Sequence, residues 1–267
     1  SWDMDLVKRM GEIAGAEMKQ FGVHLWLAPG MNIHRNPLCG RNFEYYSEDS
    51  MLTNILGKAV CQGAQSKGLM AAVKHFAYNH QETNRSGMSV FFTEQAAREN
   101  ELRGFEGAMA ENIAGGAMTA FNRVGVDYSG ASKNLLEQIT RNEWGYTGAY
   151  VTDMINGADY MNWRDIVFNG GGMALTSAAY ADSEIGLMED VKTDIAKDTA
   201  FQEALKLNIK YWLYNLVKTN AMNGITNTSV MESVTPWWQM AFYGVDVFLA
   251  LLTLLFVVLY AKKIKKA

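Results

Sequence analysis

Residues 50–76, SMLTNILGKAVCQGAQSKGLMAAVKHF, decide how this chain folds. The first part predicts a helix over 50–66, because its apolar side chains recur at helical spacing on one face: Leu52, Ile55, Leu56, Ala59 and Val60. Gly68 ends this helix, and the apolar run 70–76 that follows is typical of a buried strand. The stretch is therefore one helix-to-strand step of an α/β fold.

The same alternation continues on both sides of this stretch. Further helices are predicted over residues 4–20, 93–111, 132–143 and, in two pieces, 187–220. Strands are expected to start near residues 23, 70, 116, 148 and 173. Asp3 and Ser132 are candidate N-caps for two of the helices, and Gly22 stands just past the end of the first.

Strands that alternate with helices indicate a parallel sheet covered by helices. A dinucleotide-binding or P-loop fold lacks its phosphate signal, since no GxGxxG follows the first strand and no GxxxxGK[ST] occurs. Lys74 and His75 end the second strand and Asp153 ends the fourth, where a (β/α)8 barrel carries its catalytic groups. Five strands do not close such a barrel. We expect an α/β fold: a partial (β/α)8 TIM-type barrel followed by a single transmembrane helix.

The run 240–260, MAFYGVDVFLALLTLLFVVLY, predicts the transmembrane helix. It would span about 30 Å, the thickness of a bilayer core, and Asp246 is its one charged residue. Tryptophans precede it and four lysines follow it, as interfacial anchors and the positive-inside rule require. The alternative is a buried C-terminal helix of a soluble protein.

These features suggest four segments. They are a partial barrel over 1–224, a linker over 225–238, a transmembrane helix over 239–261 and a basic cytoplasmic tail over 262–267. The expected location is the cell membrane, crossed once, with the barrel domain extracellular and the C-terminus cytoplasmic. Because the chain opens Ser-Trp-Asp, without Met or a signal peptide, we expect a further segment before it.

Composition excludes several classes of protein. The net charge is −4 even with the C-terminal lysines counted, so the rest of the chain is more acidic still. No affinity for nucleic acid is therefore indicated. Cys39 and Cys61 are too few for a disulfide framework or a zinc module. His34 and His80 have no partner at metal-ligand spacing, so we expect neither a metal nor a cofactor.

Four motifs resemble glycoside hydrolase family 3, in its β-glucosidase branch. They are PLCGRNFEYYSED (37–49), KHFAYNHQETNR (74–85), GAMTAFN (116–122) and NEWGYTGAYVTD (142–153). They stand in the order and at the spacing of that family, and the likeness extends over roughly residues 1–224.

The resemblance implies a retaining hydrolysis of terminal β-glycosidic bonds in a β-glucoside or oligosaccharide. Asp153 would be the nucleophile, and a second carboxyl group about 5–5.5 Å away would be the acid/base. Arg41, Lys74, His75 and Arg85 match residues that bind the hydroxyls of the terminal sugar. We also expect Arg41 and Lys74 to lower the pKa of Asp153, since nearby positive charge favours a carboxylate.

The chain also departs from the family pattern. Phe121 stands where these enzymes carry a tyrosine whose hydroxyl lies near the nucleophile. Met154 replaces a tryptophan beside the sugar, so both positions are expected in the substrate site but with altered contacts. The loop after KHF lacks the Asp-x-His of the hexosaminidase branch. The resemblance therefore implies that a glutamate from a missing α/β-sandwich domain supplies the acid/base.

Taken without the resemblance, the same residues have simpler interpretations. Asp153 can be a helix cap, Lys74-His75 an ordinary strand end, and Arg41 can pair with Glu44 or Glu48 of its own loop. Three function classes stay open: a membrane-anchored β-glycosidase, a non-catalytic sugar-binding or sensing relative, and a membrane protein whose barrel only supports partners.

Overall fold

The structure, a computed structural model, describes residues 2–155, 160–176, 193, 195–226, 228–230, 232 and 234–264. The chain divides into two compact units, Ser1–Asn223 and Gly224–Ala267. Residues 187–192 of the helix predicted over 187–220 lie outside the described residues, as do Lys265 and Lys266 of the predicted tail.

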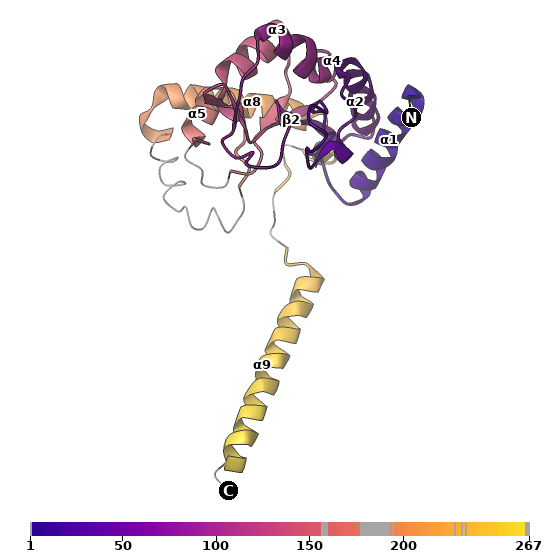
Figure 1. Ribbon diagram of the computed structural model, residues 1–267. Helices are drawn as coiled ribbons and strands as arrows, with labels where there is room; N and C mark the ends of the chain where they lie inside the picture. Colours follow the sequence, from indigo (N-terminus) through magenta and orange to yellow (C-terminus); the bar gives the residue numbers. More distant parts are fainter. Residues whose placement is uncertain are drawn as a thin grey trace. The chain divides into compact units, whose positions relative to one another are not determined.

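A four-stranded parallel sheet occupies the centre of the first unit, in the order β1-β2-β4-β7 (Figure 1). Its strands are β1 (Leu25–Trp26), β2 (Met70–Phe76), β4 (Gly116–Thr119) and β7 (Ala149–Val151). These strands confirm the four predicted near 23, 70, 116 and 148. The strand predicted near 173 is present as a single parallel bridge from Met173 to Val151.

The first strand is shorter than the apolar run that predicted it. Pro29 has no amide N–H with which to continue the ladder. Pairing with β2 resumes just beyond it, where Gly30 forms a parallel bridge with Lys74 and the Met31 N–H donates to the Lys74 carbonyl (2.6 Å). The chain after β1 is thereby held against the carboxyl end of β2.

Helices α1 (Met4–Gln20) and α2 (Ser50–Gln65) pack against each other, and α2 also packs on α4 (Arg103–Ala110). The predicted cap of α1 is confirmed: Asp3 Oδ1 accepts from the N–H groups of Asp5 and Leu6, both at 3.0 Å. Glycines allow the two helices to approach closely. A Cβ at Gly63 of α2 would overlap the carbonyl oxygen of Lys8, and one at Gly11 of α1 that of Val60.

The two middle helices differ in detail from the prediction. The segment 93–111 consists of α3 (Glu94–Ala96), the π-helical turn η2 (Ala97–Glu101) and α4 (Arg103–Ala110). The segment 132–143 is the π-helix η4 (Asn134–Glu143). Ser132 directly precedes this helical segment with an extended backbone (φ −81°, ψ 101°), and its carbonyl accepts from the Leu136 N–H (2.9 Å), so it has the backbone geometry of the predicted N-cap. Hydrophobic spacing does not distinguish an α-turn from a π-turn.

A second, smaller sheet was not expected from the sequence. In it β3 (Ser89–Val90) runs parallel to β5 (Arg123–Val124), which pairs antiparallel with β6 (Asp127–Tyr128). Gly125 turns the chain between β5 and β6 with a φ of +63°. Each strand has two residues, too few to produce a periodic pattern.

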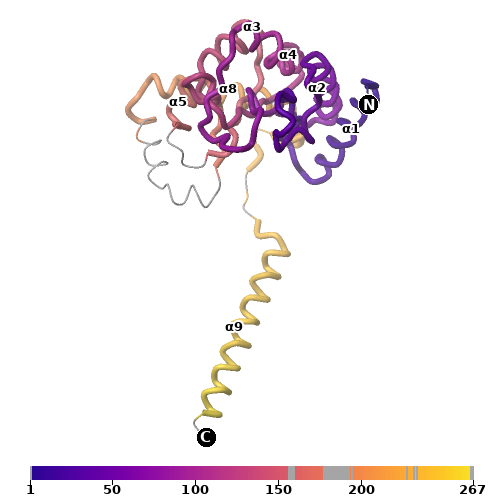
Figure 2. Tube along the Cα trace, in the orientation of Figure 1, coloured from indigo at the N-terminus to yellow at the C-terminus, as the bar shows by residue number. Residues whose placement is uncertain are grey.

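The remaining elements close the first unit. Helices α5 (Trp163–Phe168) and α8 (Thr199–Leu216) pack on each other, and the Trp212 indole N–H of α8 donates to the Tyr150 carbonyl of β7 (2.9 Å). The short turns are η1 (Asn42–Glu44), η3 (Ser129–Ala131) and η5 (Asn220–Met222). Across this unit the colour in Figure 2 passes from indigo at α1 to orange near α5.

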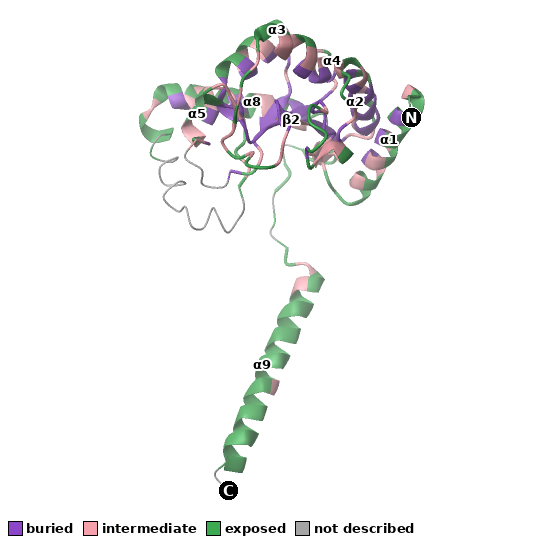
Figure 3. Ribbon diagram, viewed as in Figure 1, coloured by how far each residue is buried: buried purple, intermediate pink, exposed green. Residues whose placement is uncertain are grey.

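The core lies between the sheet and the helices, where the buried residues gather in Figure 3. Phe76 of β2 is fully buried, with its ring 5.2 Å from that of Phe105 on α4 and 6.5 Å from that of Tyr150 on β7. Burying such a ring stabilises a fold by about 1.5–3 kcal/mol. This aromatic contact joins the middle of the sheet to its helical cover.

The second unit contains α9 (Trp237–Ile264), a helix of 28 residues. It is long and apolar enough to cross a membrane by length and composition, and its side chains are exposed along its length (Figure 3). Lys262 and Lys263 stand in its last turn.

The contact between α1 and α2 yields a test of the fold. We expect Gly63→Ala to lower the free energy of unfolding by about 1–3 kcal/mol, because the added methyl must push the Lys8 backbone away. Urea unfolding of the chain, followed by tryptophan fluorescence, measures this. Gly40→Ala is the matched control, since its methyl meets the Glu82 side chain at an ordinary 3.4 Å. Equal stability of the two variants would contradict the close approach.

Candidate active site

The side chains selected from the sequence come together at one edge of the sheet. Lys74 and His75 lie at the carboxyl end of β2, Phe121 follows β4, and Asp153 follows β7. Because β4 pairs in parallel with both β2 and β7, these three strand ends are neighbours. Arg41 precedes η1, on the segment that follows β1. The structure thus gathers residues that are more than one hundred positions apart.

Asp153 lies at the centre of this group, with its side chain 14% exposed. Its backbone N–H donates to the Thr119 carbonyl (3.1 Å), which ties the residue to the end of β4. Its Oδ1 accepts from the Met154 N–H at 2.8 Å, and its Oδ2 is 3.8 Å from His75 Nε2. One carboxylate oxygen is therefore fixed by the backbone, and the other faces the imidazole.

The pKa of Asp153 is raised, and burial is the main cause. The Met154 N–H and the charges of Arg85, Arg41 and Lys74 act in the opposite direction, but together they do not outweigh the loss of water. The lowering expected from Arg41 and Lys74 is confirmed as a contribution to this pKa, but burial outweighs it and the net shift is upward. Sequence spacing indicates neighbours, whereas desolvation depends on the whole fold.

His75 is fixed more firmly than any other member of the group. The Asn32 side chain bonds to both backbone groups of His75: its Nδ2 donates to the carbonyl (2.9 Å) and its Oδ1 accepts from the N–H (2.8 Å). His75 Nδ1 lies 3.3 Å from the Tyr45 hydroxyl, which itself accepts from Asn79 Nδ2 (2.8 Å). Nδ1 is also 3.3 Å from Asn32 Oδ1, which can only accept, so the contacts of Nδ1 fit a proton on either ring nitrogen.

Burial, and then the nearby positive charges, lower the pKa of His75 well below its ordinary value. The imidazole is therefore neutral at neutral pH, and its 3.8 Å contact with Asp153 is a polar contact, not an ion pair. A neutral imidazole has one ring N–H and one ring acceptor, so it can bond to a hydroxyl placed beside the carboxylate.

Two glutamates complete the charge balance, and sequence reasoning did not place them in the site. Glu44 pairs with Arg41 through Oε1, and its Oε2 is 3.5 Å from Lys74 Nζ. Glu82 Oε2 is 2.9 Å from Arg85, and its Oε1 is 3.9 Å from Arg41. Of the two partners considered for Arg41 on its own loop, the structure selects Glu44. The three-residue separation of Arg41 from Glu44, and of Glu82 from Arg85, is the feature of the sequence that could have predicted these ion pairs.

Arg85 and the two departures from the motif lie on the same side of the site. The Arg85 guanidinium stacks on the Phe121 ring, with its Cζ 4.3 Å from the ring centre. Phe121 itself is buried, and its carbonyl accepts from the Tyr160 hydroxyl (2.9 Å). Met154 is 46% exposed beside Asp153. Phe121 thus holds a cation, while Met154 leaves its face of the site open.

Tyr128 of β6 is a further neighbour that the sequence did not reveal. Its hydroxyl lies 3.4 Å from that of Thr119, and the negative charge of Asp153 contributes to the raised pKa of the phenol, after burial. A buried tyrosine hydroxyl therefore lies near the carboxylate even though Phe121 carries none. Tyr128 is held in this position by the small sheet, which no pattern in the sequence predicted.

The loop that carries Arg85 is anchored by a buried charged group. Glu101 of η2 is almost fully buried and pairs with His80 Nε2 (2.5 Å) and Arg35 Nη1 (2.8 Å). Asn79 joins this loop to the site, because its Nδ2 donates to Tyr45 and to Glu82 Oε1 (2.9 Å). His80 thus has a structural role, through its hydrogen bond to Glu101.

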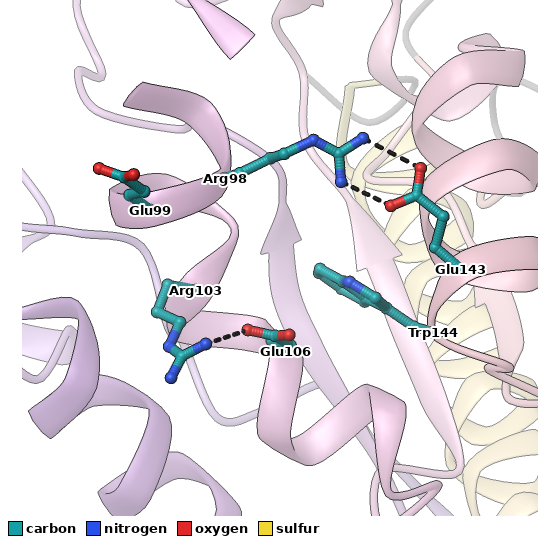
Figure 4. Close-up of a pocket in the computed structure, with 6 residues that line it drawn as sticks. All are labelled: Arg98, Glu99, Arg103, Glu106, Glu143 and Trp144. Carbon is teal, nitrogen blue, oxygen red and sulfur yellow. Dashed lines mark hydrogen bonds and ion pairs between the residues drawn. The ribbon is translucent and has the colours of Figure 1, made fainter. Parts of the chain in front are cut away.

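A hollow elsewhere on the first unit is lined by none of these residues. It has a volume of about 510 Å³ and lies between η2, α4 and η4 (Figure 4). Arg98 donates to both carboxylate oxygens of Glu143, and Arg103 donates to Glu106 (2.9 Å), with Trp144 between the two pairs. The two guanidinium groups that line this hollow are therefore already paired with carboxylates and are not free to bind a ligand. The candidate active site is therefore the group around Asp153.

Among the described residues, no three His, Cys, Asp or Glu side chains are grouped as metal ligands. The chemistry available at the site is that of one carboxyl group, a neutral imidazole and three cations held by two glutamates.

Comparison with known proteins gives a consistent result. Residues 1–210 match the Glycosyl hydrolase family 3 N terminal domain. The chain is 42% identical over 153 residues to beta-glucosidase A of Butyrivibrio fibrisolvens, and 40% identical over 153 residues to thermostable beta-glucosidase B of Acetivibrio thermocellus. These matches cover 57% of the chain but only 18% and 20% of the two relatives.

Solved structures agree with the sequence matches. The chain resembles beta-glucosidase 3B from Thermotoga neapolitana, solved in complex with α-D-glucose, with a TM-score of 0.77 and 34% identity. That likeness covers 83% of this chain and 31% of the other. A beta-glucosidase from Paenibacillus barengoltzii matches with a TM-score of 0.74 and 33% identity, over 86% of this chain and 26% of the other.

The burial of Asp153 gives a prediction about stability. Because its pKa is raised by folding, the ionised carboxylate costs stability at every pH above that raised pKa. We expect Asp153→Asn to raise the free energy of unfolding at pH 7. The gain shrinks as the pH falls through the folded pKa, and it is absent below about 3.9, where the carboxyl group is protonated in both states.

Urea unfolding of both proteins between pH 3.5 and pH 7 measures this difference. Asp127→Asn, at an exposed position of β6, is the control and is expected to leave the profile unchanged. If Asp153→Asn unfolds with a lower free energy than the unaltered chain at pH 7, the three cations outweigh burial, and folding lowers the pKa of Asp153 instead of raising it.

Proposed function

The chain belongs to glycosyl hydrolase family 3, and from this membership we propose that it is part of a membrane-anchored, retaining β-glucosidase-like O-glycosyl hydrolase. The observation that carries the proposal is the grouping of Asp153 with His75, Lys74, Arg41 and Arg85 at adjacent strand ends. The substrate is a terminal β-glucoside or an oligosaccharide, in keeping with the β-glucosidase names of the relatives.

In the proposed reaction, Asp153 is the nucleophile. Its Oδ2, the oxygen not occupied by the Met154 N–H, attacks the anomeric carbon, and the bond from that carbon to the leaving oxygen breaks. A glycosyl ester on Asp153 results, and water then hydrolyses it with retention of configuration. The three cations keep a share of Asp153 ionised in spite of its burial.

The remaining groups bind and orient the terminal sugar. The Lys74 ammonium and the guanidinium groups of Arg41 and Arg85 are donors to sugar hydroxyls, and the neutral His75 imidazole is a further hydrogen-bonding partner for them. Glu44 and Glu82 hold these cations in position before the sugar arrives, which lowers the cost of ordering them on binding. Such bonds accelerate the reaction if they strengthen as the sugar ring flattens.

The acid/base belongs to another part of the enzyme in this proposal. Glu44 and Glu82 are each engaged by two cations, so neither is placed as a free proton donor to a leaving group. The chain spans 18% and 20% of the first two curated relatives, which leaves room for a further domain. We assign the acid/base to a glutamate of an α/β-sandwich domain outside this chain.

A second candidate function is sugar binding or sensing without turnover. Two observations favour it: Phe121 presents no hydroxyl and is covered by Arg85, and Met154 offers no flat surface on which a sugar can stack. The buried hydroxyl of Tyr128 near Asp153 weighs for catalysis instead.

The proposal also places α9 across a membrane. Its length exceeds the roughly 20 residues that a bilayer requires. Its apolar side chains are exposed, so outside a membrane they would contact water, whereas in a membrane they would contact lipid tails. The tryptophans at its start and the lysines in its last turn set the direction, with the first unit outside and the C-terminus in the cytoplasm.

Covalent labelling tests catalysis by Asp153. We expect 2-deoxy-2-fluoro-β-D-glucosyl fluoride to add one fluoroglucosyl group to the peptide that contains Asp153, as seen by mass spectrometry. Fluoride leaves without a proton donor, so the missing acid/base is not required. Asp153→Asn should lower the labelling rate at least about a thousandfold, because the nucleophile is removed.

The control for labelling is Asp127→Asn, which should react like the unaltered chain. A chain that binds glucose saturably in calorimetry but takes no label supports the sugar-binding alternative. Label on another carboxyl group would show that Asp153 is not the nucleophile.

Membrane anchorage has its own test. The full chain should float with lipid vesicles and resist alkaline extraction, whereas a chain ending at residue 236 should stay soluble. In intact cells, a membrane-impermeant maleimide should modify Ser229→Cys but not Lys263→Cys, while the buried Cys39 and Cys61 serve as an internal background. The reverse labelling pattern would invert the proposed orientation.

A further inference from the structure

The polar side chains of α9 are not scattered around the helix. Between residues 239 and 260 the side chains with a polar or ionisable group are Gln239, Tyr243, Asp246, Thr253 and Tyr260. Their successive separations are four, three, seven and seven residues. Every other position in this range is apolar.

These separations place all five on one stripe with a period of 3.5 residues, which Ala250 and Val257 complete. In heptad notation, the stripe holds Gln239, Asp246, Thr253 and Tyr260 at d and the remaining three residues at a. We call these seven residues the α9 seam. A seam with this period faces a second helix in a left-handed pair.

The other common membrane packing has no support in the sequence. Right-handed pairs need small residues four apart, which let two backbones approach closely. The small residues of α9 are Ala241, Gly244, Ala250 and Ala261, and no two of them have that spacing. The heptad seam is therefore the one helix-pairing pattern that α9 carries.

Asp246 is too deep to be explained by contact with lipid headgroups. It stands four residues from the middle of the run 240–260, or about 6 Å from the bilayer centre. The nearest edge of the hydrocarbon is then about 9 Å further away, beyond the reach of an aspartate side chain. A carboxyl group at this depth requires a polar partner.

The seam also holds internal contacts that prepare it for a partner. Gln239 Nε2 donates to the Tyr243 hydroxyl (2.7 Å), so two seam residues already form one polar group. Thr253 satisfies its own hydroxyl proton on the Leu249 carbonyl (2.8 Å), and its oxygen can still accept. Asp246 is exposed on the helix surface.

We propose that the α9 seam binds a second copy of this chain, as a parallel, in-register pair of helices with Asp246 against Asp246. The proposal rests on the membrane crossing proposed above. Copies inserted in one direction can pair only in parallel, and in a parallel pair each d residue meets its own counterpart.

The chemistry of the seam suits a second copy. Glutamine, threonine and tyrosine side chains both donate and accept hydrogen bonds, so each is complementary to itself. A carboxyl group in its acid form donates through its O–H and accepts through its carbonyl oxygen, so two facing Asp246 side chains can also bond to each other. A different partner with a lysine or arginine at the same depth is the competing occupant.

Cysteine cross-linking of the full chain in lipid vesicles tests the seam. In a background of Cys39→Ala and Cys61→Ala, Ala250→Cys lies on the seam, and Leu252→Cys lies about 200° around the helix at a similar depth. We expect oxidation to produce roughly tenfold more disulfide-linked dimer from Ala250→Cys than from Leu252→Cys.

Two variants at Asp246 identify the partner. The exchange Asp246→Val/Val245→Asp keeps the composition of the span but turns the carboxyl group off the seam. We expect it to raise the dissociation constant of the dimer roughly tenfold, measured by energy transfer between labelled copies at increasing lipid dilution. Asp246→Asn, which still donates and accepts, should dissociate like the unaltered chain.

The other outcomes overturn the proposal in distinguishable ways. Equal cross-linking at both positions, in a chain that floats with the vesicles, rejects the seam and leaves the membrane crossing intact. Absence of energy transfer between unaltered copies rejects self-pairing and leaves a basic partner as the occupant. Dissociation of Asp246→Asn as strong as that of the exchange variant contradicts the facing pair of Asp246 side chains. A chain that does not float rejects the membrane crossing and the seam together.

Discussion

Parallel hydrogen bonding of β4 with β2 on one side and β7 on the other is the constraint on which the first unit depends. Parallel strands all point the same way, so each must end at the same edge before a helix returns the chain. Lys74 and His75, Phe121 and Asp153 follow three different strands and still meet. The aromatic contact of Phe76 with Phe105 and Tyr150 holds this sheet against its helices, so the geometry of the site is a consequence of packing.

The site itself is a balance between water loss and charge. Burial raises the pKa of Asp153 and lowers that of His75, so both groups are driven toward their neutral forms. The three cations oppose the first shift and reinforce the second. Glu44 and Glu82 keep the cations from repelling one another, which makes these glutamates part of the device that controls the carboxylate. A site built in this way is costly to the fold.

The forces that drive packing in the first unit differ from those that would act on α9 in the proposed membrane. In the first unit, apolar burial drives packing, and the glycines of α1 and α2 set how closely two helices approach. In a bilayer, the apolar surface of α9 gains nothing from contact with another helix, because lipid tails are equally apolar. Polar groups and side-chain shape must supply the attraction there. The restriction of the polar residues of α9 to one stripe is consistent with that requirement.

Local patterns sufficed for the parts of the chain whose conformation is decided locally. The bounds of α1 with its Asp3 cap, the helix α2, the strand β2 and the long apolar helix α9 are all legible as periodicity, capping and length. The residues that meet at the strand ends were also identifiable, since the motifs that carry them resemble a known family. Only the tertiary structure decided the π-turns of η2 and η4, the small sheet that brings Tyr128 to Asp153, and the pairing of Glu44 and Glu82 with the cations. It also decided the net shift of the Asp153 pKa, because the burial that outweighs the cations is a property of the whole fold. The physical reason is the same in each case. These features depend on desolvation and on contacts between segments far apart in the sequence. Neither can be predicted from the residues that stand next to a given residue in the chain.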